Sequence, residues 1–330
     1  MNQRLYILTG RLVFVLLVLS GLFMSCSAIY DDRDDCPEGL RIHFKYDYNM
    51  KYANAFAKEV TKVNLYVFDE TGRFVKQQSE EGDSLKNENY YMKLNLDPGK
   101  YQLIAWGGLD DQSFNAPVLT AGTSRLEDLK VALKEAQTSK TDLHFLFHGF
   151  NTSDSLLDFN GDYQQYMIPM VKNTNRIRII LQEISGEKVD ADAYRFEIAD
   201  DNSLMTYNNT VLSNGNTVYT PYTKGQSTVG DDPAVTVAYA EISTARLIAG
   251  HNTRLRVFRN ADNTTVLDIP LIDYLMLTEM EGHKSAMTAQ EYLDRQDEYS
   301  IVLFLNNLSW WNIKVIVNGW TVRLNETGIQ

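Results

Sequence analysis

Hydrophobic and polar residues alternate along most of the chain from Gly39 onward. The run RIHFKYDY places Ile42, Phe44 and Tyr46 on one face of an extended chain and polar residues on the other. The runs KVNLYVFD at 62–69 and YYMKLNL at 90–96 repeat this alternation. A period of two residues is typical of half-buried antiparallel strands. The sequence therefore predicts a mainly β fold.

A polar interruption divides the pattern into two groups of strands. The stretch 148–166 is rich in Asn, Ser, Asp and Gly, and alternation resumes in RIRIILQEI at 176–184 and WNIKVIVNGWTVRL at 311–324. Each group of strands needs a second sheet to cover its apolar face. We therefore expect two tandem antiparallel β-sandwiches, an N-terminal one at 39–160 and a C-terminal one at 161–330.

Glycine and asparagine mark the expected turns between strands. Gly72 in DETGRF, the pair Asn214–Gly215 and the stretch 250–252 each separate two strand patterns. Asn-Gly pairs and glycines between alternating runs are the strongest short-range signals of a hairpin. The sequence therefore predicts a hairpin at each of these three places.

Three segments predict short helices. SRLEDLKVALKEA at 124–136 has Ser124 and Glu127 at the spacing of a capping box, with leucines at helical intervals. DIPLIDYLMLTE has Pro270, a residue that suits a first helical turn. TAQEYLDR has Thr288 and Glu291 as a second capping box. We expect these helices to lie on or between the sheets.

The first 25 residues have the organisation of a secretory signal peptide. Arg4 and Arg11 precede an apolar run from Leu12 to Phe23, which is shorter than the roughly 20 residues of a spanning helix. Ser25 and Cys26 follow, and Cys26 stands where bacterial lipoproteins carry their lipidated cysteine. The positions before it match the usual lipobox only loosely. Plain secretion with a chance cysteine is the alternative.

A lipidated Cys26 would be the first residue of the mature chain, and its two or three acyl chains would anchor it stably in a membrane. Residues 26–38 contain four aspartates, so we expect a solvated acidic linker. Cys36 would be the remaining thiol, whereas without lipidation Cys26 and Cys36 could close a disulfide loop. The run DDRDD lacks the spacing of a calcium-binding loop.

The chain has 330 residues and a formal net charge of -12. An acidic chain without a basic patch has no electrostatic footprint for nucleic acid, so we expect no such partner. The common catalytic motifs are absent from the sequence. His144 and His148 stand four apart, but the intervening FLF favours a strand over a metal site. The acidic pairs Asp110–Asp111 and Asp200–Asp201 fit solvated turns. The sequence predicts no enzyme, no metal and no cofactor.

A series of motifs follows the cysteine in a fixed order: CPEGLRIHFKYDY, KVNLYVFDETGRFV, LDPGKYQLIAWGGL, NRIRIIL, EISTARLI and a terminal IKVIVNGW. With the lipobox, this set resembles FimB-type fimbrial anchor subunits, the lipoproteins at the base of type V pili. The resemblance implies two tandem transthyretin-like β-sandwich domains. It also implies a chain lipid-anchored in the outer membrane that attaches fimbriae to the cell and acts in their assembly and in adhesion. The acidic residues after Cys26 resemble a signal for display on the outer leaflet, which implies surface exposure.

The resemblance further implies a partner, the fimbrial shaft (major pilin) subunit, joined by strand donation. Shaft subunits of this class are trimmed near the N-terminus, but an anchor held by an N-terminal lipid would lose its tether. We therefore expect the strand in GLRIHFKYDY to stay paired. The candidate shaft contacts are Ile313, Val315, Val317, Val322 and Leu324. The first three serve equally well as ordinary core residues.

Two other classes of function stay open. A surface lipoprotein that binds glycans would share the tether and the sandwiches, and the 19 tyrosines could stack on sugars. Exposed tyrosines and tryptophans clustered on one face would favour it. A secreted hydrolase would need a concave pocket with convergent polar groups. The sequence does not identify a host or bacterial surface ligand.

Overall fold

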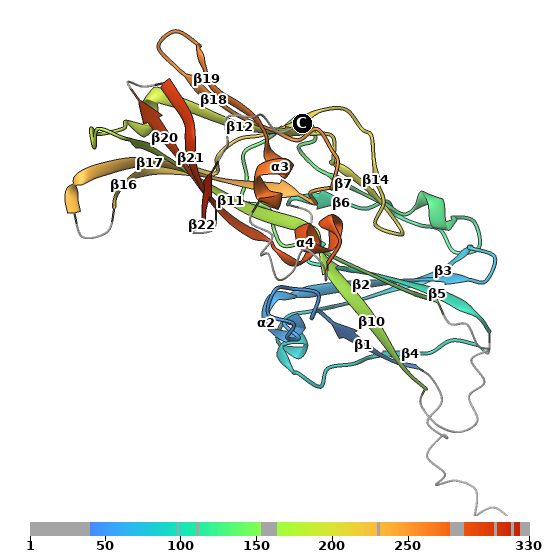
Figure 1. The fold of residues 1–330 in the computed structure, drawn as a ribbon. Coiled ribbons are helices and arrows are strands. Elements are labelled where there is room, and N and C mark those ends of the chain that lie inside the picture. Colours follow the sequence, from blue (N-terminus) through green and yellow to red (C-terminus); the bar gives the residue numbers. More distant parts are fainter. Residues whose placement is uncertain are drawn as a thin grey trace, which may run out of the picture.

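The computed structural model of the protein describes residues 40–97, 99–109, 112–152, 164–229, 232–277, 287–306, 309–317 and 320–323. Strands dominate these residues, which confirms the predicted mainly β fold. The described part contains three short α-helices, α2 (Phe56–Glu59), α3 (Leu271–Met276) and α4 (Ala289–Arg295). The predicted signal peptide, Cys26 and the acidic linker lie outside the described residues. Figure 1 shows the strands gathered into an N-terminal and a C-terminal unit.

The N-terminal unit is built on one seven-stranded sheet that folds around its own core. The strand order is β3 (Phe74–Glu81), β2 (Lys62–Asp69), β5 (Tyr101–Gly107), β9 (Phe147–Thr152), β10 (Gln164–Lys172), β1 (Leu40–Lys45) and β4 (Met92–Leu94). β10 pairs with β1 along its first six residues and with β9 along its last three, so it joins the two halves of the sheet. The core between them includes Leu40, Ile42 and Leu103.

Strand β2 is buried on both faces. Val63, Leu65 and Val67 belong to the core of the N-terminal unit. Tyr66 and Phe68 point the other way, as a period of two requires, and pack in a second and larger core. The run KVNLYVFD is therefore a fully buried strand rather than the half-buried one that its alternation predicts. It binds the two units together.

The C-terminal unit contains three sheets. The six-stranded sheet has the order β16 (Thr223–Val229), β17 (Asp232–Ala245), β11 (Thr174–Glu183), β20 (Glu298–Asn306), β21 (Ser309–Val317) and β22 (Trp320–Arg323). The five-stranded sheet has the order β19 (Thr265–Pro270), β18 (Arg254–Arg259), β12 (Tyr194–Asp200), β15 (Thr217–Tyr219) and β8 (Thr138–Ser139). The four-stranded sheet has the order β14 (Val211–Leu212), β13 (Leu204–Thr206), β7 (Lys130–Leu133) and β6 (Phe114–Asn115). Their shared core includes Ile177, Ile179, Phe196 and Val257.

The chain passes between the units more than once. β7 and β8 come before residue 160, yet they pair with β13 and β15 of the C-terminal unit. β10 comes after residue 160, yet it belongs to the N-terminal sheet. The sheets therefore cross the boundary that the polar stretch 148–166 predicts between 160 and 161.

Most strand pairs are antiparallel, as expected, but three pairs are parallel and were not predicted. β1 pairs with β10, β11 with β20, and β15 with β8 in parallel. Parallel partners are joined by long connections, so a pattern that repeats every two residues carries no information about them. The first two of these pairs form the spine of the molecule, because only Asn173 separates β10 from β11.

One of the three predicted helices is wrong. Segment 124–136 forms a single 3₁₀ turn, η2 (Leu126–Asp128), and then strand β7. Pairing with β13 satisfies the backbone of β7, and this tertiary contact outweighs the local helix signal. The other two are confirmed: α3 begins after Pro270, and the Thr288 hydroxyl accepts a hydrogen bond from the Glu291 amide at 3.1 Å at the start of α4.

One of the three predicted hairpins is confirmed. Gly72, at φ 77°, turns the chain between β2 and β3. The Asp69 carboxylate supports this turn by accepting hydrogen bonds from the amides of Thr71 and Arg73. Gly215 and Gly250 also have positive φ angles. However, they lie on connections between different sheets, β14 to β15 and β17 to β18, so the hairpins predicted there are wrong.

Candidate assembly surface

A β protein that joins a partner by strand addition needs a sheet edge with unpaired backbone groups. Several edges of the described sheets are unsuitable, because β6, β8 and β14 have two residues each. The longer edge strands are β3, β4, β16, β19 and β22. These five edges differ in what covers or protects them.

The two edges of the N-terminal sheet are bridged to each other. The Gln78 side chain on β3 donates to the Lys93 carbonyl on β4 at 2.9 Å, and the Lys76 ammonium group donates to the Asn95 carbonyl. β1 lies inside the sheet, between β10 and β4. This confirms that the strand in GLRIHFKYDY is paired, and on both sides.

The side chains of the edge strand β16 contact a neighbouring segment. The Gln226 side chain donates to the Val189 carbonyl at 2.9 Å, and the Lys224 ammonium group lies 2.9 Å from an Asp192 carboxylate oxygen. A register shift near its end also interrupts its pairing with β17. Segment 189–193 therefore lies against this side of the six-stranded sheet.

The edge strand β19 has features that protect an edge from pairing. It ends in Pro270, which has no amide hydrogen, and it includes the charged Asp268. A register shift interrupts its pairing with β18 at Val257 and Phe258. Proline, charge and bulges are devices by which natural sheets prevent edge-to-edge association.

Strand β22 is the remaining long edge, and β21 is its one strand partner in the described part of the chain. The predicted contact residues Val315 and Val317 lie on β21 opposite Leu303 and Ile301 of β20, which are both fully buried. Val322 lies on β22 opposite Val315. Ile313 is also on β21, and Leu324 lies outside the described residues. The register thus places one of the five predicted residues on the edge strand itself.

A buried lysine joins the two units near the end of β10. The Lys172 side chain is 3% exposed, and its ammonium group lies 3.0 Å from Glu59 of α2 and 2.5 Å from Asp297 before β20. It also lies 3.4 Å from the centre of the Phe145 ring. Burial, Asp297 and Glu59 together raise the pKa of the nearby Tyr46. Two acidic groups from different units therefore share one cation.

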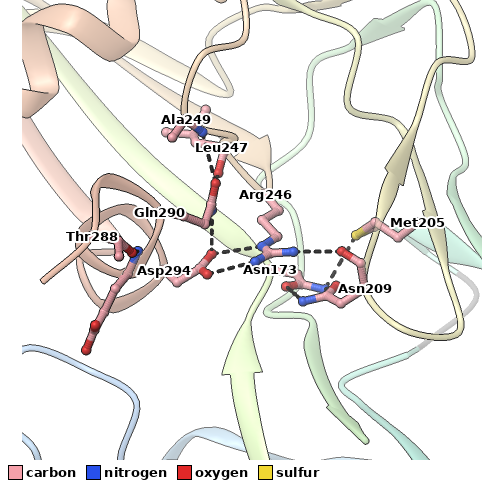
Figure 2. Close-up of polar contacts among 10 residues, drawn as sticks. Asn173, Met205, Asn209, Arg246, Leu247, Ala249, Thr288, Gln290 and Asp294 are labelled. Carbon is pink, nitrogen blue, oxygen red and sulfur yellow. Dashed lines mark hydrogen bonds and ion pairs between the residues drawn. The ribbon is translucent and has the colours of Figure 1, made fainter.

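A second polar cluster surrounds Asn173 (Figure 2). The Arg246 guanidinium donates to both Asp294 oxygens, at 2.8 and 2.7 Å, and to the Asn209 carbonyl at 2.6 Å. The side chains of Asn173 and Asn209 donate to each other, at 2.6 and 3.1 Å. Gln290 adds bonds to Asp294 and to the Leu247 carbonyl. The cluster fixes α4 against the spine.

A third contact ties α4 to the N-terminal unit. The Arg295 guanidinium donates to Glu291 at 2.8 Å and packs over the rings of Tyr48 and Tyr52, 4.0 and 4.5 Å from their centres. A groove of about 530 Å³ runs along this seam, lined in part by Lys172 and Arg295. Both of these cations are already paired with carboxylates. None of these three contacts was predicted from the sequence, although Lys172, directly after the apolar residues MIPMV of a strand, was a usable signal.

The two histidines of HFLFH differ in exposure, because His144 lies at the surface and His148 in the interior. His148 is buried on β9, and its Nε2 lies 2.7 Å from the Tyr207 carbonyl. Burial lowers the pKa of His148 to about 4. No cluster of three metal-ligating side chains occurs among the described residues. His148 packs edge-on against Trp106 and belongs to the region between the units.

The acidic pairs and aromatic residues also have structural places. Asp200 is buried rather than in a solvated turn, and it accepts a hydrogen bond from Thr253 at 2.8 Å while burial raises its pKa. Asp110 and Asp111 lie outside the described residues. Outside β21 and β22, Tyr52 is the one exposed Phe, Tyr or Trp side chain in the described ranges, at 55%. No helix among those residues is long and apolar enough to cross a membrane.

The model of a protein family, fimbrillin-A associated anchor proteins Mfa1 and Mfa2, matches residues 33–326. The chain belongs to this family of fimbrial anchor proteins. The minor fimbrium anchoring subunit Mfa2 of Porphyromonas gingivalis is 24% identical over 344 residues, with 99% of each chain covered. The resemblance to fimbrial anchor subunits seen in the motifs is confirmed, and fimbrial anchoring and adhesion are the function of the chain.

Solved structures share the fold of this family member. A candidate adhesin from Bacteroides thetaiotaomicron is 41% identical, with a TM-score of 0.81 and coverage of 89% of this chain and 100% of that one. A candidate polysaccharide-binding protein from the same species is 37% identical, with a TM-score of 0.78 and coverage of 87% and 98%. The fimbrial anchor protein Mfa2 of P. gingivalis has the same fold, with a TM-score of 0.68, 19% identity and coverage of 86% and 98%.

Proposed function

We propose that this anchor protein is held in the outer membrane by a lipid on Cys26 and binds the fimbrial shaft subunit through the edge of β22. The tether rests on the signal peptide and lipobox of the sequence and on the family of the chain. The protein then acts by binding, without catalysing a reaction. The pairing of Lys172 and Arg295, two cations that line the groove between the units, with carboxylates supports this non-enzymatic role.

One observation carries the choice of β22. Among the longer edges of the described sheets, β3 and β4 are bridged to each other, β16 has an irregular end and side chains bound to segment 189–193, and β19 is protected by Pro270. β22 has a strand neighbour on one side in the described chain. A donated strand would add a seventh strand to this sheet, and main-chain hydrogen bonds would supply the affinity.

The tether is tested by replacing Cys26 with Ala and fractionating the cells. Release of the protein together with intact fimbriae is the expected result, because both depend on the lipid. Protein that stays in the membrane fraction would overturn the tether. Protein released while fimbriae stay on the cell would overturn the anchoring role of this chain.

The edge is tested with two proline variants, Thr321→Pro and Val322→Pro. Neighbouring residues of a strand direct their amides to opposite sides, so one of the two variants removes a donor from the outer edge. We expect that variant to keep its melting temperature and to lose binding to purified shaft subunit. The matched controls, Ser227→Pro and Thr228→Pro on β16, should bind normally. Normal binding by both β22 variants would exclude the edge.

Polysaccharide binding is the second candidate function, favoured by the 37% identical structure from B. thetaiotaomicron. Against it, Tyr52 is the one exposed Phe, Tyr or Trp side chain in the described ranges outside β21 and β22, so those ranges show no exposed platform of stacked rings. A glycan array with the intact protein and with Tyr52→Ala decides this. Binding that the substitution abolishes would place a sugar at the seam between the units.

A further inference from the structure

The parallel pair of β1 and β10 has an unusual position in the chain. β1 is the first strand described, and its six residues pair with β10 from Leu40 opposite Gln164 to Lys45 opposite Pro169. β10 continues to Lys172 and enters the C-terminal unit one residue later. β1 is thus the first strand after the acidic linker, and β10 is the strand that leads directly into the other unit.

The directions of the two strands decide how tension would act on them. Because the pair is parallel, Leu40 lies at the end of β10 that is far from the C-terminal unit (Figure 1). At about 3.3 Å per residue, β10 spans about 26 Å from Gln164 to Lys172. A pull on the chain before Leu40 and an opposite pull on the C-terminal unit would therefore act along the strands. The pair would be sheared rather than peeled apart.

Shear and peeling differ in how they load hydrogen bonds. In shear, all the bonds of the ladder carry the tension together, whereas in peeling they break one after another. The bonds of a parallel ladder are evenly spaced, so a sheared pair shares the tension evenly. Forced unfolding is governed by the rate of the first opening step, and shear makes that step slow.

The end of β10 at Lys172, which leads into the C-terminal unit, is held firmly, as shear loading requires. Lys172 bonds to Glu59 and Asp297, and Asn173 bonds to Asn209. β9 pairs with the last three residues of β10 in the same sheet and packs tightly there, since a Cβ atom added at Gly149 would come within 2.5 Å of the Ile168 side chain. Tension would therefore reach the β1–β10 ladder before it could draw β10 out of the C-terminal unit.

We propose that the β1–β10 pair is a shear clamp that carries fimbrial tension between the membrane and the shaft. This inference rests on the proposed function, which places the lipid before β1 and the shaft on the C-terminal unit. The clamp explains why an anchor has its first strand inside a sheet.

Single-molecule pulling on the unlipidated mature chain with Cys36→Ser tests the clamp. DNA handles are attached to azide-bearing residues that replace Cys26 and Ala261, the latter exposed in the turn between β18 and β19. A matched second protein has its handles at Cys26 and at exposed Gln165, which pairs with Arg41 at the start of β10. The first pair of handles shears the ladder, and the second pair peels it from one end.

We expect the rupture force to be several-fold higher in the first geometry than in the second. A disulfide between His43→Cys and Met167→Cys, a register pair, should abolish the first rupture until a reductant is added. Equal forces in the two geometries, or a rupture that the disulfide leaves unchanged, would overturn the clamp. Because this test uses the isolated protein, its failure would leave the tether and edge results intact. A failed tether would likewise leave the shear resistance measurable.

Discussion

The N-terminal sheet bridges its edge strands with the side chains of Gln78 and Lys76, whereas the six-stranded sheet of the C-terminal unit ends in β22 with one strand partner in the described chain. The unit nearer the proposed lipid is thus closed to strand addition, and the unit farther from it has an available edge. This difference matches the two tasks of an anchor. In the proposed function, the N-terminal unit is tethered and the C-terminal unit binds the shaft.

The comparison requires the two units to act as one body. Lys172, His148 and Arg295 each make a contact between the units. The Arg246 cluster supports them, because it holds α4, which carries Arg295, against the spine. Each contact can be removed separately by substitution. The resulting change in the free energy of unfolding shows how strongly the N-terminal unit is coupled to the C-terminal unit.

The largest effect is expected for Arg246→Ala. The substitution leaves the carboxylate of Asp294, 6% exposed, without its bidentate partner. We expect a loss of about 3 kcal/mol in the free energy of unfolding, because breaking a buried ion pair leaves one charge buried without a partner. Urea unfolding measures this loss, and splitting into two transitions would show that the units have become independent. Arg254→Ala, which removes a more exposed pair with Asp268, should cost less than about 1 kcal/mol. Equal losses in the two variants would contradict the prediction.

The second effect is a pH dependence due to His148. Its pKa in the folded protein is lowered to about 4 by burial, against 6.5 for the free side chain. The unfolded chain binds the proton more readily between these values, so stability is full above pH 6.5 and falls as the pH decreases towards 4. The full loss is about 3 kcal/mol.

Unfolding curves of His148→Gln between pH 4 and 7 check this assignment. The variant keeps a group able to donate to the Tyr207 carbonyl but does not titrate in this range. We expect its stability to fall less than that of the natural protein as the pH decreases. An unchanged slope would assign the pH dependence to other groups.

A smaller effect is expected for Lys172→Met. The lysine is buried, but its partners Glu59 and Asp297 are 31% and 28% exposed, so solvent screens the charges that remain. We expect a loss of about 2 kcal/mol in the free energy of unfolding. Lys45→Met, which removes an exposed pair with Asp47, should change stability by about 0.5 kcal/mol or less. Losses of similar size in both variants would show that the lysine does not couple the units.

The sequence by itself determined the β character of the chain, the turn at Gly72 and the start of α4 at Thr288. These features depend on neighbours within four residues, so a local pattern is sufficient to specify them. The motif order was also enough to indicate the anchor family. The predicted residues Val315 and Val317 stay open as shaft contacts, and their register opposite buried core positions agrees with the alternative stated for them.

Only the tertiary structure decided which strands are neighbours. Alternation gives the face of a strand that is buried, but it is identical for every possible partner. Three features join residues that are far apart in sequence. They are the parallel pairing of β1 with β10, the pairing of β7 with β13 of the C-terminal unit, and the lysine shared by Glu59 and Asp297. Residues 130–133 show most directly how far a local pattern can predict structure. Their spacing favours a helix, but hydrogen bonding to β13 and burial stabilise a strand instead.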